Sequence, residues 1–191
     1  MTPFGRVYTT HAVVLKRRNV GEADRVVTIF SKEYGRMKVI AKGVRRVHSR
    51  RAPYLEVFSH VTLILHKGKT WDSISEATPI HAFPLLRESL SKISEGYYLC
   101  ELVDALTPER QEHRDVYTLL LEAMMTLNKI SKINPVEVSG LFALELLRSL
   151  GYLARDNSLP LARIDSYIER IIEKRLHTPR ILSRLSGTIS L

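Results

Sequence analysis

The chain of 191 residues has a single cysteine, Cys100, and no uninterrupted apolar run long enough to cross a bilayer. One cysteine excludes an internal disulfide and any zinc site built from a cysteine cluster. A membrane-spanning helix needs about 20 consecutive apolar residues, so none is expected. The first residues, MTPFGRVYTTHAVVLKRR, do not join a basic segment to a long apolar one, unlike a secretory signal. We therefore expect a soluble protein of the cytoplasm.

Motifs of the common enzyme classes are also missing. The sequence contains no G-x-G-x-x-G, H-E-x-x-H or G-x-S-x-G. The stretch HKGKT ends like a phosphate-binding P-loop, but position 63 is Leu63 where that motif needs glycine. The stretch also lies between two predicted strands, so we interpret Lys67-Gly68-Lys69 as a hairpin turn.

Metal-binding patterns are not evident either. Glu22 and Asp24 are the closest acidic pair in the basic half of the chain, and they balance nearby arginines better than they would form a nuclease metal site. The histidines of this half, His11, His48, His60 and His66, do not have the spacing of a ligand set. We expect no enzyme activity, no metal and no cofactor.

Positive charge is concentrated in one part of the chain. Residues 1–80 contain fifteen Lys and Arg against six Asp and Glu, whereas residues 81–191 contain fourteen of each. The whole net charge of +9 therefore belongs to the first part. The stretch KGVRRVHSRRAPY, Lys42–Tyr54, alone holds five Lys or Arg residues and no acid. Such asymmetry indicates a contact with nucleic acid or another acidic surface.

The hydrophobic pattern changes near residue 80. Before it, period-two alternation and β-branched residues predict strands at 7–17, 25–32, 36–43, 56–66 and 70–77. Five short strands in this length favour a small closed barrel of OB or SH3-like type; a two-sheet sandwich would be short of strands. We therefore expect residues 1–80 to form a small β-barrel of OB or SH3-like type that binds nucleic acid.

Residues 81–191 have helical periodicity. The pattern predicts helices over 84–106 and from Val116 to Leu127. A third helix is expected after the cap Asn134, with Gly151 as its stop. A fourth is predicted from the cap Asp165 to about Leu176, and a short piece follows Pro179. We therefore expect an α+β fold in two parts, of which the second, residues 81–191, is an all-α domain.

The cations of the third predicted strand share one face. In GRMKVIAKG, Arg36, Lys38 and Lys42 alternate with apolar residues that can enter the barrel. A phosphate backbone needs cations at intervals along a track and no base contact. The predicted DNA-binding residues are Lys16, Arg17, Arg18, Arg25, Arg36, Lys38, Lys42, Arg45, Arg46, Arg50 and Arg51.

Aromatic side chains could add base stacking. Tyr34, Tyr54 and Trp71 are candidates, and so is Phe58. Each of these aromatics has an alternative interpretation, which is packing in the core or at the rim of a small barrel.

The stretch HAVVLKRRNVGEADRVVTIFSKEYGRMKVIAKGVRR resembles the N-terminal signature of the RecO family of bacterial recombination mediators. LEVFSHVTLIL, LLRSLGY and YIERIIEKRLHTPRIL are similar to later parts of that family. The resemblance implies an OB-fold that binds single- and double-stranded DNA and promotes annealing. It also implies a helical domain that contacts the tail of the single-stranded-DNA-binding protein, binding to RecR, help in loading the recombinase, and a place at the nucleoid.

The sequence departs from that family at one point. Many relatives place paired cysteines after the Leu-Gly-Tyr, but Leu150-Gly151-Tyr152 is followed here by LARDNSLPLARID. We therefore expect no zinc, and partner contacts of that module are in doubt. For the acidic, apolar-ended partner tail, the resemblance suggests Arg148, whose alternative interpretation is an exposed helix arginine. The rival functions are a structural RNA-binding barrel associated with ribosomes and a protein adaptor for acidic partners.

Overall fold

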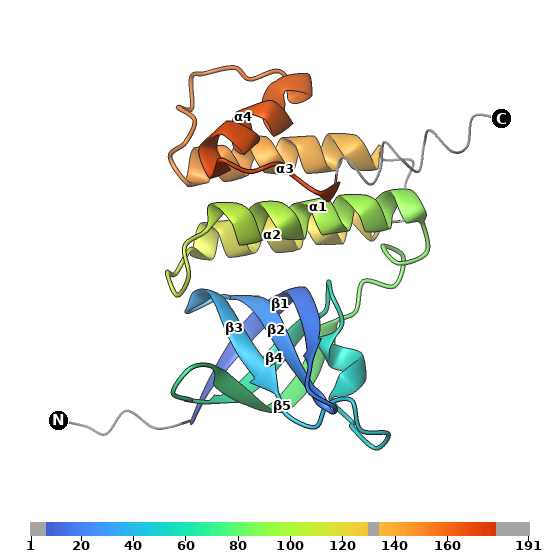
Figure 1. The fold of residues 1–191 in the computed structure, drawn as a ribbon. Coiled ribbons are helices and arrows are strands. Elements are labelled where there is room, and N and C mark those ends of the chain that lie inside the picture. The colour runs from blue at the N-terminus through green and yellow to red at the C-terminus, as the bar shows by residue number, and fades with distance from the viewer. Residues whose placement is uncertain (1–6, 130–133, 179–191) are drawn as a thin grey trace. The chain divides into compact units, whose positions relative to one another are not determined.

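A computed structural model describes residues 7–129 and 134–178, which form two compact units (Figure 1). The first unit comprises the described residues up to Ala82 together with residues 108–117. The second comprises residues 83–107 and the described residues from Thr118 onward. The sequence analysis placed one boundary near residue 80 and did not anticipate that residues 108–117 group with the strands.

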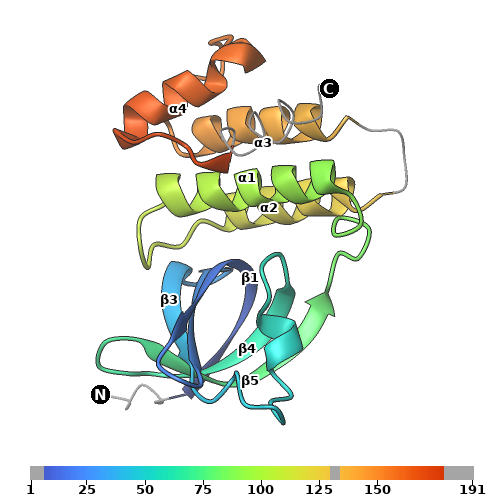
Figure 2. The ribbon, with the colours of Figure 1, turned by 45° about the vertical axis from the view of Figure 1, so that its right-hand side comes forward.

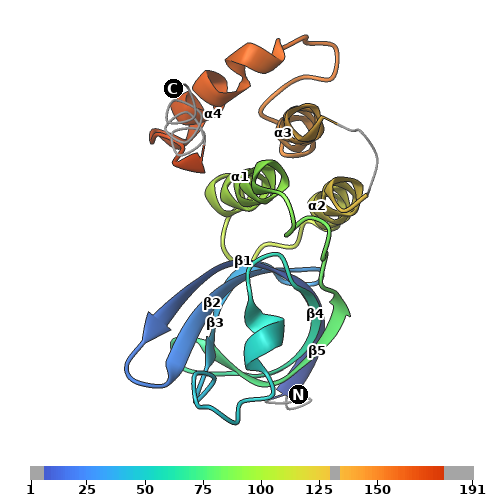
Figure 3. The same ribbon diagram turned by 90° about the vertical axis from the view of Figure 1, so that its right-hand side faces the viewer.

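The first unit contains five strands in its described residues. They are β1 (Val7–Val20), β2 (Asp24–Ser31), β3 (Gly35–Ala41), β4 (His60–His66) and β5 (Asp72–His81). They close into a barrel in the order β1-β2-β3-β5-β4. All pairs are antiparallel except β3 with β5, which pair in parallel at Val39 and Asp72. This is the strand order of an OB-type barrel, so the predicted two-part α+β fold is confirmed (Figure 3).

Alternation along β3 separates a core face from an outer face. Met37, Val39 and Ala41 are at most 1% exposed and belong to the barrel core. Lys38 and Lys42, at alternate positions, are exposed. The period-two pattern therefore predicted correctly which β3 residues enter the barrel.

A short helix that the sequence analysis did not anticipate lies between β3 and β4. It is the 3-10 helix η1 (Ala52–Leu55), which begins directly after Arg51 and places Leu55 in the barrel core. Figure 3 shows it over one end of the barrel. β4 begins at His60 rather than at the predicted residue 56, because residues 56–59 form a turn. Ser59 N donates to Glu56 O at 3.1 Å, and Phe58 has a φ of 73°.

Residues 108–117 complete the first unit on the side of β3. Glu109 forms a parallel bridge with Arg36, and Arg110 N donates to Arg36 O at 2.7 Å. Gly35, at a φ of 64°, makes this approach possible: a Cβ there would lie 1.7 Å from Gln111 O. The segment was assigned to the helical part from sequence because the bridge depends on tertiary contact and leaves no local pattern.

The second unit is helical. Its helices are α1 (Leu90–Leu106), α2 (Arg114–Leu127, of which residues from 118 belong here), α3 (Pro135–Ser149), η2 (Leu161–Arg163) and α4 (Ile164–Ile172). α1 lies beside α3 (Figure 2). Its core is built by buried apolar residues that include Leu99, Leu102, Leu120, Met124, Phe142, Leu146, Ile164 and Ile168.

The predicted helix ends are partly confirmed. Asn134 caps α3 by accepting from Val136 N at 3.1 Å, and Gly151 follows that helix at a φ of 77°. α1 begins at Leu90 rather than at residue 84, because the preceding residues form a turn in which Asn128 Oδ1 accepts from Leu86 N. α4 begins before Asp165, so that residue lies in its first turn and is not the cap. The piece expected after Pro179 lies outside the described residues.

Candidate nucleic-acid interface

Two exposed lysines lie at one level of the outer face of the barrel. Lys16 of β1 is paired in register with Thr28 of β2, and Thr28 is paired with Lys38 of β3. Directly paired residues project to the same side of a sheet. The neighbours of Thr28, Val27 and Ile29, belong to the barrel core, so Thr28 and both lysines point outward. This register brings cations of the first and third strands close together.

Arg18 lies one level further along the same face. It is paired with Val26, which is paired with Ile40. Its guanidinium carbon lies 5.7 Å from the ring centroid of Trp71, in the turn between β4 and β5. The two side chains meet although β2 and β3 separate their strands in the barrel order. Trp71 is half-buried, so part of its ring remains open.

The basic loop, residues 42–51, is held against the turn between β1 and β2. Arg45 N donates to Ala23 O at 2.9 Å, and Arg45 Nη1 donates to Gly21 O at 3.2 Å. Gly43 N donates to Asp24 Oδ1 at 2.7 Å. These bonds place the loop beside the ends of β1 and β2. Within it, Lys42, Arg45, Arg46 and Arg50 are exposed.

We call the exposed cations of these three groups the basic face; they are Lys16, Arg18, Lys38, Lys42, Arg45, Arg46 and Arg50. The cations of β1, of β3 and of the basic loop come together because β1, β2 and β3 are neighbours in the barrel. The face carries several positive charges on an open surface, which suits contact with phosphate groups.

Two of the predicted DNA-binding arginines are held by an acidic neighbour. Arg17 Nε lies 2.7 Å from Glu56 Oε2, and Arg25 Nη1 lies 2.9 Å from Glu56 Oε1. The side chain of Arg25 is only 11% exposed. Glu56 follows η1 directly, so this double ion pair ties the loop end to β1 and β2. Both arginines add to the positive electrostatic potential of this surface, but their guanidinium groups are already paired with Glu56.

Arg51 also stabilises the fold, through hydrogen bonds from its side chain to backbone carbonyls. Its guanidinium donates to the carbonyl oxygens of Ile74 in β5 and, at 2.8 Å, of Lys42. Both acceptors are backbone groups, so the side chain clamps the end of the basic loop to the barrel. Arg36 is half-buried beside the bridge with Glu109.

The candidate aromatics lie in different places. Tyr34 is 39% exposed and contacts Tyr8 edge-on, with ring centroids 4.8 Å apart. It lies in the turn between β2 and β3, at the other end of β2 from the basic loop. Tyr54 belongs to η1 and is 36% exposed. Phe58 is 2% exposed and is a packing residue.

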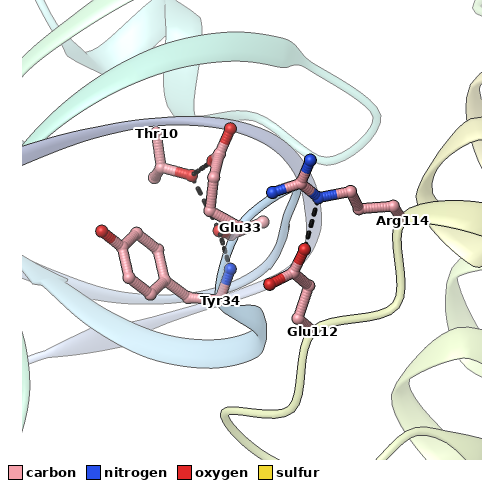
Figure 4. Close-up of polar contacts among 6 residues, drawn as sticks. Thr10, Glu33, Tyr34, Glu112 and Arg114 are labelled. Atoms are coloured by element: carbon pink, nitrogen blue, oxygen red, sulfur yellow. Dashed lines mark hydrogen bonds and ion pairs between the residues drawn. The ribbon is translucent and has the colours of Figure 1, made fainter.

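Figure 4 shows the polar contacts around Tyr34. The backbone N of Tyr34 donates to Ser31 Oγ at 3.1 Å, and Thr10 Oγ1 donates to Glu33 Oε2 at 2.5 Å. An ion pair between Arg114 and Glu112 is drawn beside them. This end of β2 therefore combines acids with its cations, unlike the basic face.

The sequence analysis did not include Lys67 and Lys69 among the DNA-binding residues. Both are exposed in the turn that carries Trp71, between β4 and β5. OB-folds use this turn and the outer face of the second and third strands to bind oligonucleotides. The signal was present as K-G-K next to a tryptophan, but it was interpreted only as a hairpin turn.

Arg148, the predicted residue of a partner-tail pocket, is engaged within its own unit. Its Nη1 lies 2.6 Å from Glu145 Oε1, and its Nη2 donates to Asn157 O at 3.4 Å. The side chain is 24% exposed. It therefore pins the loop after α3 to that helix.

Within residues 7–129 and 134–178, no cluster of three His, Cys, Asp or Glu side chains could hold a metal ion. The described helices include none with the length and apolarity to cross a membrane.

The fold and this surface define a class: an OB-type barrel with a basic outer face, continued by a helical unit. Residues 5–83 match the family model described as Recombination protein O N terminal, and residues 87–155 match Recombination protein O C terminal. The chain belongs to the RecO family.

Relatives are named DNA repair protein RecO. That of Roseiflexus sp. (strain RS-1) is 38% identical over 147 residues, which cover 77% of this chain and 51% of the relative. That of Desulfitobacterium hafniense (strain DSM 10664 / DCB-2) is 34% identical over 149 residues, covering 78% and 54%. That of Symbiobacterium thermophilum is 35% identical over 146 residues, covering 76% and 57%. The chain thus spans about half the length of these relatives.

Proposed function

We propose that this chain is a DNA-binding mediator of DNA repair and recombination that acts without catalysing a covalent reaction. It binds single- and double-stranded DNA on the basic face, promotes strand annealing, and helps load the recombinase onto DNA coated by single-stranded-DNA-binding protein. Membership of the RecO family and the name of the relatives, DNA repair protein RecO, support this proposal.

One observation carries the proposal. Lys16 of β1 and Lys38 of β3 lie on the outer face of the barrel on either side of Thr28 of β2, beside the basic loop. Neighbouring strands are about 4.8 Å apart, so the backbones of β1 and β3 are separated by roughly 10 Å. Flexible lysines at that spacing can contact different phosphates of one strand. Since these contacts involve the backbone of the nucleic acid, binding should be tolerant of sequence.

Annealing follows from the same charges. Two complementary strands repel each other through their phosphates, and a surface that neutralises part of this charge lowers the barrier to their approach. No nucleotide hydrolysis is needed for that step. RecR and the tail of the single-stranded-DNA-binding protein are the proposed protein partners. Because Arg148 already pairs with Glu145, any contact it makes with an acidic tail would compete with that ion pair.

A binding titration tests the proposal. Lys16, Lys38, Arg46 and Arg50 are replaced together by glutamine, and fluorescence anisotropy of a labelled single-stranded oligonucleotide is followed. A matched control replaces four exposed cations of the second unit, Arg155, Arg163, Lys174 and Arg175, and so has the same net charge. We expect at least tenfold weaker binding only for the first variant. Equal affinities of both variants would refute the assignment of the basic face.

Two further measurements separate the rival functions. Competition between DNA and RNA of the same sequence distinguishes the mediator from a structural RNA-binding barrel, which would prefer RNA. An annealing assay on DNA coated by single-stranded-DNA-binding protein, with and without its C-terminal tail, tests the mediator role. A protein adaptor for acidic partners would show no nucleic-acid affinity at physiological salt.

A further inference from the structure

A cavity of about 550 Å³ lies within the second unit, between α1, α3 and the segment that begins α4. Its polar wall includes Glu95 and Tyr98 of α1, Ser139 of α3 and Asp165 of α4. The cavity is separate from the basic face, and the function proposed above does not use it.

Glu95 is the most deeply buried carboxylate of this wall, at 6% exposed. Its Oε2 accepts a hydrogen bond from Ser139 Oγ. Among the described residues, no donor reaches its Oε1 and no Lys or Arg pairs with Glu95. Burial, and to a lesser extent the charge of Asp165, raise the pKa of Glu95 above its usual range. One carboxylate oxygen at the cavity wall thus lacks a partner.

Asp165 adds a second negative charge to the same wall. Its Oδ1 accepts from the hydroxyl of Tyr98. Burial and the bond to this carboxylate raise the pKa of Tyr98, so the hydroxyl stays a neutral donor. Among the described residues that line the cavity there is no lysine or arginine. Glu137 is a third carboxylate of the lining, but it is exposed. Glu95 and Asp165 have no compensating cation among the described residues, which is costly where water access is reduced.

The rim of the cavity is apolar and open. Val136 of α3 is 60% exposed, and Leu161 of η2 is 48% exposed. Both line the cavity. Such side chains can cover the methylene stem of a long cationic residue, and also the apolar residues on either side of it. A free polyamine would leave this rim uncovered.

We infer that this cavity binds an arginine side chain presented by an apolar-flanked peptide segment of a partner protein. The guanidinium carries five donors in a planar fork, which suits the free oxygens of Glu95 and Asp165 better than a point charge does. Its stem lies along Val136 and Leu161. An acidic peptide tail is repelled by the same carboxylates, so this site is distinct from one for the acidic partner proposed above. The inference does not depend on DNA binding by the barrel.

The test compares three short peptides by NMR on the complete, isotope-labelled chain. The probes are acetyl-Leu-Arg-Leu-amide, the same peptide with citrulline, which is a neutral isostere of arginine, and the same peptide with glutamate. We expect saturable shifts of the backbone amides of Ser139 and Gly140 with the arginine peptide. Citrulline should weaken binding at least tenfold, and the glutamate peptide should not bind. Equal binding of the arginine and citrulline peptides, or no shift with arginine, would overturn the inference.

Variants locate the site. The double change Glu95→Gln and Asp165→Asn should weaken the arginine peptide at least tenfold. The control Glu88→Gln with Asp156→Asn removes two exposed carboxylates outside the cavity and should leave affinity unchanged. Equal loss in both variants would mean that general surface charge, not the cavity, attracts the peptide, and would overturn the inference. If the first variant does not fold, the citrulline comparison on the unaltered chain decides. Spermidine that binds as tightly as the peptide would overturn the peptide assignment.

Discussion

The guanidinium of Arg18 lies 5.7 Å from the ring centroid of Trp71, and the two residues come from β1 and from the turn before β5. Trp71 is the only tryptophan of the chain. It therefore reports on one place, next to Lys67 and Lys69 and to the basic face. The predictions below begin from this pair.

Single-stranded DNA should change the fluorescence of Trp71. If a base stacks on the exposed part of the ring, a titration with oligothymidylate should quench the emission until binding saturates. Base stacking contributes about 1–3 kcal/mol, so Trp71→Ala should weaken binding roughly 5- to 150-fold. Trp71→Phe should retain more of the affinity because it keeps an aromatic face. Unchanged affinity of Trp71→Ala would show that this ring does not contact DNA.

Binding should weaken steeply with salt, and each phosphate contact should contribute to the slope. With about six contacts to a single strand, log K should fall with log salt at a slope near −4. Replacing Lys38 by glutamine should make the slope shallower by about 0.7, since one contact is lost. Lys174→Gln, in the second unit, is the control and should not change it. An identical slope for both variants would remove Lys38 from the interface.

Arg51 and Arg50 are neighbours in sequence but should respond differently to substitution. Arg51→Ala removes donors to the carbonyls of Ile74 and Lys42 and should lower the free energy of unfolding by about 1–3 kcal/mol. Arg50 is exposed, so Arg50→Ala should change stability by less than about 0.5 kcal/mol while weakening DNA binding. Urea denaturation and anisotropy measure the two effects. Equal stabilities would mean that the clamp is not significant.

Gly35 and Gly21 offer a matched pair of glycine substitutions. Both have positive φ, 64° and 57°, so alanine is strained at each by about 1 kcal/mol. At Gly35 the added Cβ would also meet Gln111 O at 1.7 Å, whereas nothing lies within 4 Å at Gly21. Gly35→Ala should therefore lower the melting temperature much more than Gly21→Ala. Equal losses would argue that residues 108–117 do not pack against β3.

The sequence predicted the strands and the α3 cap because their signals are local. Alternation along β3 identifies its outward lysines, and Asn134 followed by Pro135 marks a helix start. The engagement of Arg25 with Glu56 and the bridge of Glu109 to Arg36 depend on residues far apart in sequence. No periodicity encodes such pairs. The candidate cations can therefore be read from the sequence, but only the fold shows which of them are held by an acidic neighbour or a backbone carbonyl.

His60 should make the stability of the chain depend on pH. It is 7% exposed, its Nε2 lies 2.8 Å from the hydroxyl of Tyr117, and its ring stacks with His81 at 5.7 Å. Its buried Nδ1 has no hydrogen-bond partner. Burial, followed by the nearby charges of His81 and His11, lowers the pKa of His60 to about 4 from 6.5.

The sign of the effect follows from proton binding in the two states. Between pH 6.5 and about 4 the unfolded chain takes up a proton at His60 but the folded chain does not, so stability falls as pH falls through this window. Above pH 6.5 both forms are neutral and the effect is absent. The full loss is about 3 kcal/mol. His60→Gln should flatten this part of the stability curve measured by urea denaturation, whereas His66→Gln, at an exposed position, should not. If the His60 variant keeps the slope of the unaltered chain, another group controls acid sensitivity.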